Sequence, residues 1–263
     1  MDPRFFRRFR WISKSKRVRR AGHSIGAYPR YILFDPEVDN FTYELANDSE
    51  LARWVAVVSN SAFSQADALI KEPLHDYELR DRLRKATAKH PLWSKPLPPF
   101  GRRRGWYALV RALAPALVFE TGVHDGLGSL LLLRALERNR EQGHPGRLIS
   151  IDVNPSSGWL VGAHPQWELH VGPSRTLLPR LLASVDEVGL FIHDSLHTYA
   201  NEKFELSITA DHLADKGVLV TDNAHVTGAL TELCEQRAYQ FCQFRERPVD
   251  HFYGGGAMAA GFG

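Results

Sequence analysis

Alternating apolar and polar segments after residue 104 predict a sheet that is covered by helices. Short apolar runs of strand length recur there, and each is followed by a longer segment with apolar residues at helical spacing. The predicted strands lie at 116–119, 147–151, 167–171, 188–192 and 218–221, and the predicted helices at 127–140, 176–184, 200–214 and 227–237. This alternation is typical of an α/β fold with a mainly parallel sheet and helices on both faces. Two more strand candidates, 239–245 and 255–261, have no helix between them and predict an antiparallel terminal hairpin as strands six and seven.

The first hundred residues follow a different pattern, which predicts helices without strands between them. Helical spacing or composition predicts helices at 42–61, 63–71 and 77–89, and a short strand is a candidate at 31–34. Four prolines between 91 and 99 end this region, because proline disfavours helix before it. A helix at 105–114 then leads into the first strand. We predict three parts: a basic arm at 1–21, a helical N-terminal cap at 22–104 and an α/β domain at 105–263.

A glycine-rich turn follows the first strand of the predicted sheet. Glu120 and Thr121 end the apolar run, Gly122, Gly126 and Gly128 follow, and a helix with Ser129 in its first turn begins near residue 127. Such a turn lets a ligand approach the backbone, and the helix N-terminus offers unpaired N–H groups, which suits a nucleotide-like ligand. The spacing is neither the dinucleotide pattern nor a Walker loop, so a pyrophosphate or triphosphate is disfavoured. The alternative is a merely structural turn between strand and helix.

Polar residues also follow the other strands, where ligands bind in open α/β sheets. Asp152 follows the second strand, 24 residues after Gly128, where an acid accepts the hydroxyls of a ribose. Its alternative role is a helix N-cap. Ser174 follows the third strand and is a further candidate for cofactor contact.

Asp194, Asp222 and Asn223 form an oxygen-rich set after the fourth and fifth strands. Carboxylate and amide oxygens suit Mg²⁺, whereas zinc prefers more nitrogen or sulfur. His197, three residues after Asp194, is a candidate base, because histidine titrates near neutral pH. With His193 the same turn resembles a ferrous site of two histidines and one carboxylate, but the neighbouring Asp222 and Asn223 favour the oxygen site.

Composition excludes several other classes of protein. The chain of 263 residues is 44% hydrophobic and has no apolar run long enough to span a bilayer. No apolar segment follows the N-terminal charges, so we expect a cytoplasmic protein. Cys234 and Cys242 lie outside any metal-ligand spacing and are interpreted as core thiols.

The N-terminal arm carries an uneven share of the charge. Residues 1–20 contain nine Lys/Arg and one acid, which gives +8, so that the remainder of this +3 chain carries −5. Aromatic residues between the basic ones are compatible with an amphipathic helix on an anionic membrane or with a nucleic-acid arm. We favour a solvated extension that packs its aromatics on the body, and the acidic body argues against a nucleic-acid partner.

Residues 105–263 resemble class I S-adenosylmethionine-dependent methyltransferases. The closest likeness is to the metal-dependent small-molecule O-methyltransferases, such as the macrocin and mycinamicin enzymes, and more distantly catechol O-methyltransferase. Residues 190–199 and 219–223 carry the most specific part of it. The resemblance implies the Rossmann-like class I methyltransferase fold, with Asp194, Asp222 and Asn223 as Mg²⁺ ligands and His197 as the base, in a catalytic pair with Asp194. His124 and Pro173 depart from the family pattern.

The predicted function is therefore Mg²⁺-dependent O-methylation of a hydroxyl on a small molecule, a natural product or sugar, with S-adenosylmethionine as methyl donor. The alternatives are an N-methyltransferase without a catalytic metal and a nucleic-acid binding or modifying protein that uses the basic arm. We also expect a homo-oligomer. The predicted cofactor contacts are Glu120, Thr121, Gly122, Gly126, Ser129, Asp152, Ser174 and Asp194.

Overall fold

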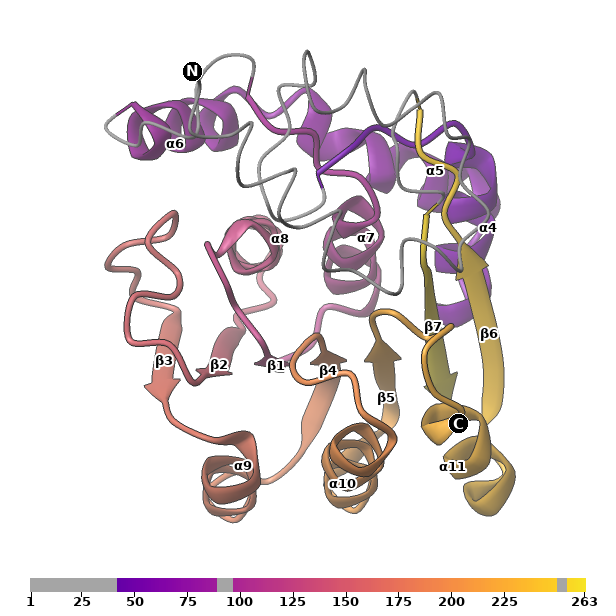
Figure 1. The fold of residues 1–263 in the computed structure, drawn as a ribbon. Coiled ribbons are helices and arrows are strands. Elements are labelled where there is room, and N and C mark those ends of the chain that lie inside the picture. The colour runs from indigo at the N-terminus through magenta and orange to yellow at the C-terminus, as the bar shows by residue number, and fades with distance from the viewer. Residues whose placement is uncertain (1–41, 89–96, 250–254) are drawn as a thin grey trace, which may run out of the picture.

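The computed structural model describes residues 42–88, 97–249 and 255–263, and within them the predicted α/β fold is confirmed. Seven strands form one sheet in the order β3-β2-β1-β4-β5-β7-β6 (Figure 1). Strands β1 to β5 are parallel to one another, and β7 is antiparallel to both β5 and β6. The strands are β1 (Leu117–Thr121), β2 (Arg147–Asp152), β3 (Trp167–Val171), β4 (Val188–His193), β5 (Leu213–Thr221), β6 (Gln240–Arg245) and β7 (Ala257–Phe262).

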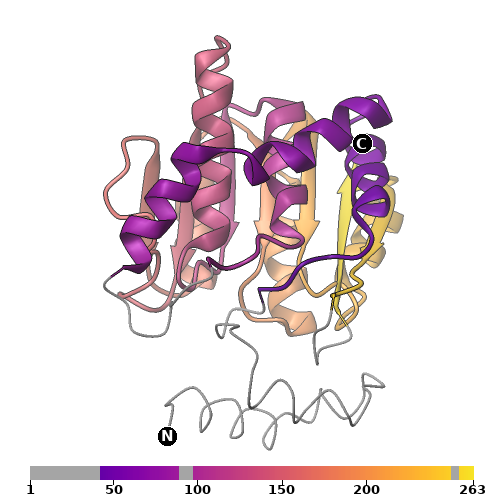
Figure 2. The same cartoon turned by 90° about the horizontal axis from the view of Figure 1, so that it is seen from above.

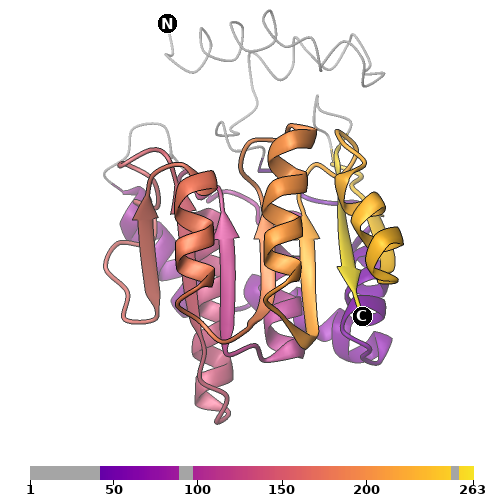
Figure 3. The same cartoon turned by 90° about the horizontal axis from the view of Figure 1, so that it is seen from below.

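Helices cover both faces of the sheet. One face carries α4 (Asp48–Val58), α5 (Phe63–Lys71), the short 3₁₀ helix η1 (Glu72–Leu74), α6 (Tyr77–Thr87), α7 (Arg103–Leu113) and α8 (Leu127–Glu141), with α4 to α6 crossing over α7 and α8 (Figure 2). The opposite face carries α9 (Ser174–Leu182), α10 (Tyr199–Ala210) and α11 (Ala229–Arg237) (Figure 3). Within the described ranges no helix combines the length and the apolar character needed to cross a membrane.

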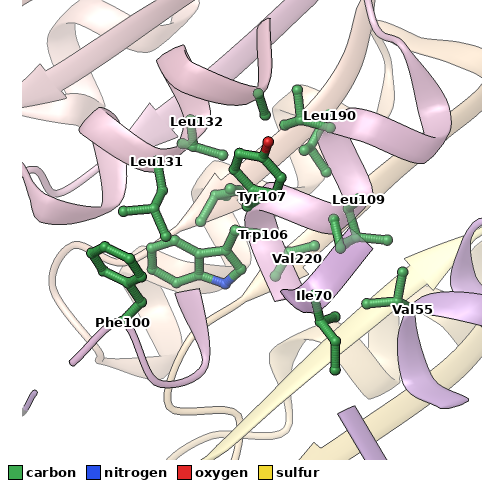
Figure 4. Close-up of a cluster of buried hydrophobic side chains, with 14 of the residues drawn as sticks. Val55, Ile70, Phe100, Trp106, Tyr107, Leu109, Leu131, Leu132, Leu190 and Val220 are labelled. Carbon is green, nitrogen blue, oxygen red and sulfur yellow. The ribbon is translucent and has the colours of Figure 1, made fainter. Parts of the chain in front are cut away.

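The N-terminal helices share one hydrophobic core with the sheet. Val55 of α4 and Ile70 of α5 belong to the same buried cluster as Trp106 of α7, Leu131 of α8 and Val220 of β5 (Figure 4). Burial of apolar surface is the main favourable term in folding. The predicted cap and domain therefore meet through a continuous core, and the predicted boundary at residue 104 lies inside the first turn of α7.

The predicted helix at 42–61 is wrong at its N-terminal end, because residues 42–47 are not helical and α4 begins only at Asp48. The Ala46 amide donates to the carbonyl of Arg247 at 2.8 Å, and Leu45 forms an isolated bridge with Pro248. Partners about 200 residues away in sequence thus override a local helical pattern, as tertiary contacts commonly do.

The predicted helix at 200–214 extends too far, since α10 ends at Ala210 and β5 already begins at Leu213. Leu213 pairs with Val188 of β4, and the ladder shifts register before Leu190. Charged residues in this outer part of β5 hide its strand character from a hydrophobic pattern. The basic arm at 1–21 and the candidate strand at 31–34 lie outside the described residues.

Candidate active site

The turn after β1 is held tightly against the end of β4. Gly122 has φ +88°, and its amide donates to the carbonyl of Ile151 at 2.9 Å. A Cβ at this position would lie 2.1 Å from the backbone oxygen of Asp194. Only glycine meets both conditions, because a left-handed backbone and a missing side chain are needed together. The turn thereby brings the glycine loop and the Asp194 turn together.

Glu120 is a buried carboxyl at the carboxyl end of β1. Its Oε2 accepts hydrogen bonds from the Ser129 hydroxyl at 2.6 Å and the Ser150 hydroxyl at 2.9 Å. Burial raises the pKa of Glu120 to about 7, and the two serine bonds offset that rise only in part. A cation bound beside Glu120 would therefore stabilise its ionised form, which burial disfavours.

Asp152, at the end of β2, organises the glycine loop from the other side. Its Oδ2 accepts from the backbone amides of Val123 at 2.7 Å and His124 at 3.0 Å, while Oδ1 accepts from the amide of Asn154 at 2.8 Å. Burial raises the pKa of Asp152, but the three backbone hydrogen bonds together lower it by more, so the net shift is downward. The N-cap alternative is wrong, because no helix begins after this residue.

A pocket opens between the glycine loop, the first turn of α7 and the end of β4. It encloses about 270 Å³, part of which is open to solvent. Charged groups dominate its lining, with apolar contributions from α7 and α8. The lining residues are Arg103, Trp106, Glu120, Gly122, Val123, His124, Asp125, Leu127, Gly128 and Asp194.

Asp194, His197 and Asp222 converge beside this pocket, each offering a ligand atom within 4.8 Å of the others. His197 Nε2 lies 3.6 Å from Asp194 Oδ1 and 2.9 Å from the Asn223 side-chain nitrogen. Burial lowers the pKa of His197, yet the nearby carboxylates raise it more, so the net shift is upward. Burial and the charge of Asp222 raise the pKa of Asp194. The sequence-predicted metal residues and base are thus neighbours in space.

Asp222 already has a counter-ion, which the sequence analysis did not foresee. Arg102 Nε lies 2.5 Å from Asp222 Oδ1 and Nη2 lies 2.7 Å from Oδ2, a bidentate ion pair of two buried side chains. Glu246 lies 3.6 Å from the same Nε and accepts a hydrogen bond from Tyr43. Burial opposes ionisation of both partners, but their mutual attraction lowers the pKa of Asp222 and raises that of Arg102.

A second buried carboxylate, Glu205 of α10, was also missed. It accepts from His193 Nδ1 at 2.7 Å, from Asn201 at 2.8 Å and from three hydroxyls. Those hydroxyls belong to Thr121, Ser174 and Ser195. Burial opposes its ionisation, but the His193 bond and the others lower the pKa of Glu205 to about 2.

The predicted cofactor residues therefore fall into three groups. Glu120, Gly122 and Asp194 line the pocket, while Gly126 and Asp152 shape the loop beside it. The remaining three donate their hydroxyls to buried carboxylates: Ser129 to Glu120, and Thr121 and Ser174 to Glu205. The described contacts of these three residues position the carboxylates of Glu120 and Glu205.

Comparisons with known proteins agree with this architecture. Residues 119–224 match a family model described as a methyltransferase domain. No curated protein sequence matches the chain significantly. The fold is similar to the O-methyltransferase TomG from Streptomyces achromogenes, solved in complex with SAM, with 19% identity and a TM-score of 0.52 over 72% of this chain and 90% of that one. It is also similar to an O-methyltransferase from Bacillus cereus in complex with SAH, with 14% identity and a TM-score of 0.53 over 81% of this chain and 100% of that one.

The matched segment holds β1, the glycine loop, α8 and the Asp194 and Asp222 turns, which build the pocket and the cluster beside it. The strand order with an antiparallel β7 is that of the class I fold shared with those structures. Residues 119–224 are therefore similar to a methyltransferase domain, and the chain has the class I methyltransferase fold.

Proposed function

We propose that this methyltransferase uses S-adenosylmethionine to methylate a hydroxyl oxygen of a small molecule. The observation that carries the proposal is the juxtaposition of the pocket and the Asp194–His197–Asp222 cluster, with Asp194 belonging to both. A methyl donor in the pocket would present its reactive carbon toward the cluster. The TomG and Bacillus cereus structures, which are O-methyltransferases holding SAM and SAH, support the same assignment.

The pocket residues have chemistry that suits this cofactor. Glu120, with its raised pKa, would accept the ammonium group, and Gly122 lets the ligand pass close to the backbone. Asp152 stands at the end of β2, where an acid accepts ribose hydroxyls. In its described state this carboxylate holds the Val123 and His124 amides, and its lone pairs leave capacity for further donors.

Residues beside the pocket also fit a divalent cation. Two carboxylates and an amide are oxygen ligands that Mg²⁺ accepts, and the donor atoms of Asp194 and Asp222 are close enough to share one ion. Asp194, Asp222 and Asn223 would hold it, and the ion would share the Asp222 carboxylate with Arg102, which is hydrogen-bonded to both of its oxygens. When bound, Mg²⁺ would lower the pKa of the acceptor hydroxyl.

His197 supplies the base in this proposal. Its Nε2 faces Asp194, which stabilises the imidazolium that forms when the ring accepts the hydroxyl proton. The oxygen then attacks the methyl carbon, the carbon–sulfur bond breaks, and S-adenosylhomocysteine leaves with the electron pair. Positioning supplies much of the rate, because the sulfonium is already a good leaving group.

A second candidate is transfer without a metal, to an amine or an acidic hydroxyl. The observation that favours it is the Arg102–Asp222 ion pair, which already neutralises one predicted metal ligand. In that case Asp222 would be structural, and His197 would act with Asp194 alone.

Calorimetry and turnover measurements in EDTA distinguish metal-dependent from metal-free methyl transfer. Titration with S-adenosylmethionine should give saturable binding with or without Mg²⁺, and failure to bind would overturn the proposed function. EDTA should then abolish methylation of model catechols and sugars without changing cofactor affinity. His197→Ala should lower the rate about 10²–10⁴-fold and keep cofactor binding. Undiminished turnover in EDTA would favour the metal-free candidate.

A further inference from the structure

Arg103 stands where α7 meets the pocket, although the sequence analysis placed it outside the α/β domain. It is the first residue of α7, it is 7% exposed, and it lines the pocket together with Glu120 and Asp194. Its guanidinium carbon lies 5.9 Å from the centre of the Trp106 ring, which also lines the pocket. At this distance the ring attracts the guanidinium and favours its position beside the pocket.

The charges around the pocket are complementary to a ligand with two cationic groups and one anionic group. The lining contains three acids, Glu120, Asp125 and Asp194, and one arginine. His124 joins them on the exposed side of the loop, next to Asp125. The amino-acid end of S-adenosylmethionine carries an ammonium, a sulfonium and a carboxylate. Glu120 and Asp194 match the cations, and Arg103 matches the carboxylate.

The adjacent arginine shows why Arg103 and not Arg102 takes this role. Arg102 is bound at both oxygens of Asp222, which raises its pKa far above the ordinary value. Burial and the positive charge of Arg102 instead lower the pKa of Arg103, and Asp194 and Asp222 offset this only in part. Arg103 lines the pocket, whereas Arg102 is not among the lining residues.

We propose that Arg103 binds the carboxylate of the amino-acid end of S-adenosylmethionine, an inference that rests on the proposed function. A guanidinium binds a carboxylate with two parallel hydrogen bonds, which adds orientation as well as affinity. Arg103 thereby turns the methionyl chain so that its ammonium meets Glu120 and its sulfonium faces Asp194. The other source of an anion is an acidic group on the methyl acceptor, and the experiment below distinguishes the two.

The test compares two cofactors in the absence of acceptor, so that no turnover occurs. Calorimetry measures the binding of S-adenosylmethionine and of decarboxylated S-adenosylmethionine, which keeps the sulfonium and the amine but lacks the carboxylate. Arg103→Gln should weaken S-adenosylmethionine about 10-fold to 100-fold, the usual effect of losing hydrogen bonds between charged groups. The decarboxylated cofactor should lose less than about threefold. Arg111→Gln, at the other end of α7 and paired with Glu72, is the matched control and should change neither affinity.

Equal losses for both cofactors would overturn the proposal, because Arg103 would then act only through the fold of the pocket. Unchanged affinity for both would also overturn it, because the cofactor carboxylate would then bind without Arg103. If Arg103→Gln does not fold by thermal melting, Arg103→Lys replaces it, and a preserved preference for the carboxylate is then expected with a smaller loss. Wild-type protein that binds neither cofactor would instead refute the proposed function itself.

Discussion

Glu205 and Glu120 are both buried glutamates at the carboxyl edge of the sheet, yet their surroundings differ. Glu205 receives hydrogen bonds from five side chains and has a pKa of about 2. Glu120 receives bonds from two serines, lines the pocket and has a pKa of about 7. The first carboxylate is satisfied within the fold, whereas the second is stabilised less than its burial demands. The difference separates a carboxylate whose burial is offset by the fold from a pocket carboxyl whose burial is offset only in part.

The adjacent arginines at the start of α7 differ in their position relative to the pocket. Arg102 is satisfied by Asp222, and Arg103 faces the pocket. Burial alone therefore does not identify a binding residue. The discriminating quantity is how much of the desolvation cost the protein itself offsets.

Removing Glu205 should cause the largest loss of stability. Glu205→Ala leaves His193, Asn201 and three hydroxyls without their acceptor, so the free energy of unfolding should fall by about 3–5 kcal/mol. Urea unfolding at pH 7 measures this loss. Glu205→Gln, which keeps the size and one acceptor, should lose less. If Glu205→Ala lowers the free energy of unfolding by less than about 1 kcal/mol, the hydrogen bonds to Glu205 do not stabilise the fold as expected.

The two glutamates should act on stability in different pH ranges. The folded pKa of Glu120, about 7, exceeds its ordinary value of 4.5, so the folded state holds a proton that the unfolded chain releases. Stability should therefore fall as pH rises from about 4.5 to 7, by about 3 kcal/mol. Glu120→Gln should abolish that slope in urea unfolding.

Glu205 gives the opposite sign and serves as the control. Its folded pKa of about 2 lies below 4.5, so its contribution is present above pH 4.5 and is lost as pH falls toward 2. Glu205→Gln should flatten that acidic range and leave the slope between pH 4.5 and 7 unchanged. If both variants change the same range, the assignment of the two pKa values is wrong.

A glycine pair tests the contact that joins the two regions. Gly122 and Gly143 have nearly the same backbone angle, φ +88° and +89°, but a Cβ at Gly143 would meet nothing within 4 Å. Gly143→Ala should cost about 1 kcal/mol for the left-handed backbone alone. Gly122→Ala should cost about 2 kcal/mol more, because its Cβ would collide with the Asp194 carbonyl. Equal costs by thermal unfolding would show that the loop moves away freely.

The smallest expected effect comes from Ser129. Ser129→Ala removes one of the two hydroxyl donors to Glu120 and should raise the pKa of that carboxyl further. The free energy of unfolding at pH 7.5 should fall by about 1 kcal/mol. At pH 4.5, where Glu120 is protonated, the loss should be smaller. A loss that is independent of pH would indicate a packing effect instead.

Local patterns were sufficient to predict most of the fold. The helix at 63–71 and the strand at 167–171 have the predicted bounds, and the helix buries Ala66 and Ile70 at helical spacing. The non-helical segment at 42–47 and the outer part of β5 were missed, because their partners are distant in sequence. A periodic pattern contains no information about such partners.

The site could be predicted only where chain order brings residues to strand ends. Asp194, His197 and Asp222 follow strands β4 and β5, so the parallel sheet places them together. Arg103 comes from a run of three arginines before the sheet, and the sequence does not reveal which of them faces the pocket. One feature of the sequence could have indicated Glu205. It lies on the same helical face as Glu202 and Thr209, and this face of α10 is buried.

The long-range ties between α4 and the last two strands have a consequence for synthesis on the ribosome. The Trp54 indole donates to the carbonyl of Cys242 at 3.0 Å, across 188 residues of sequence. At about 5–20 residues per second, the ribosome needs roughly 10–40 s to make the chain between them. During that interval α4 has no β6 to cover its apolar face, and chaperones can bind it. A chain that ends before residue 242 therefore lacks both the acceptor of the Trp54 indole and the strand that packs against α4.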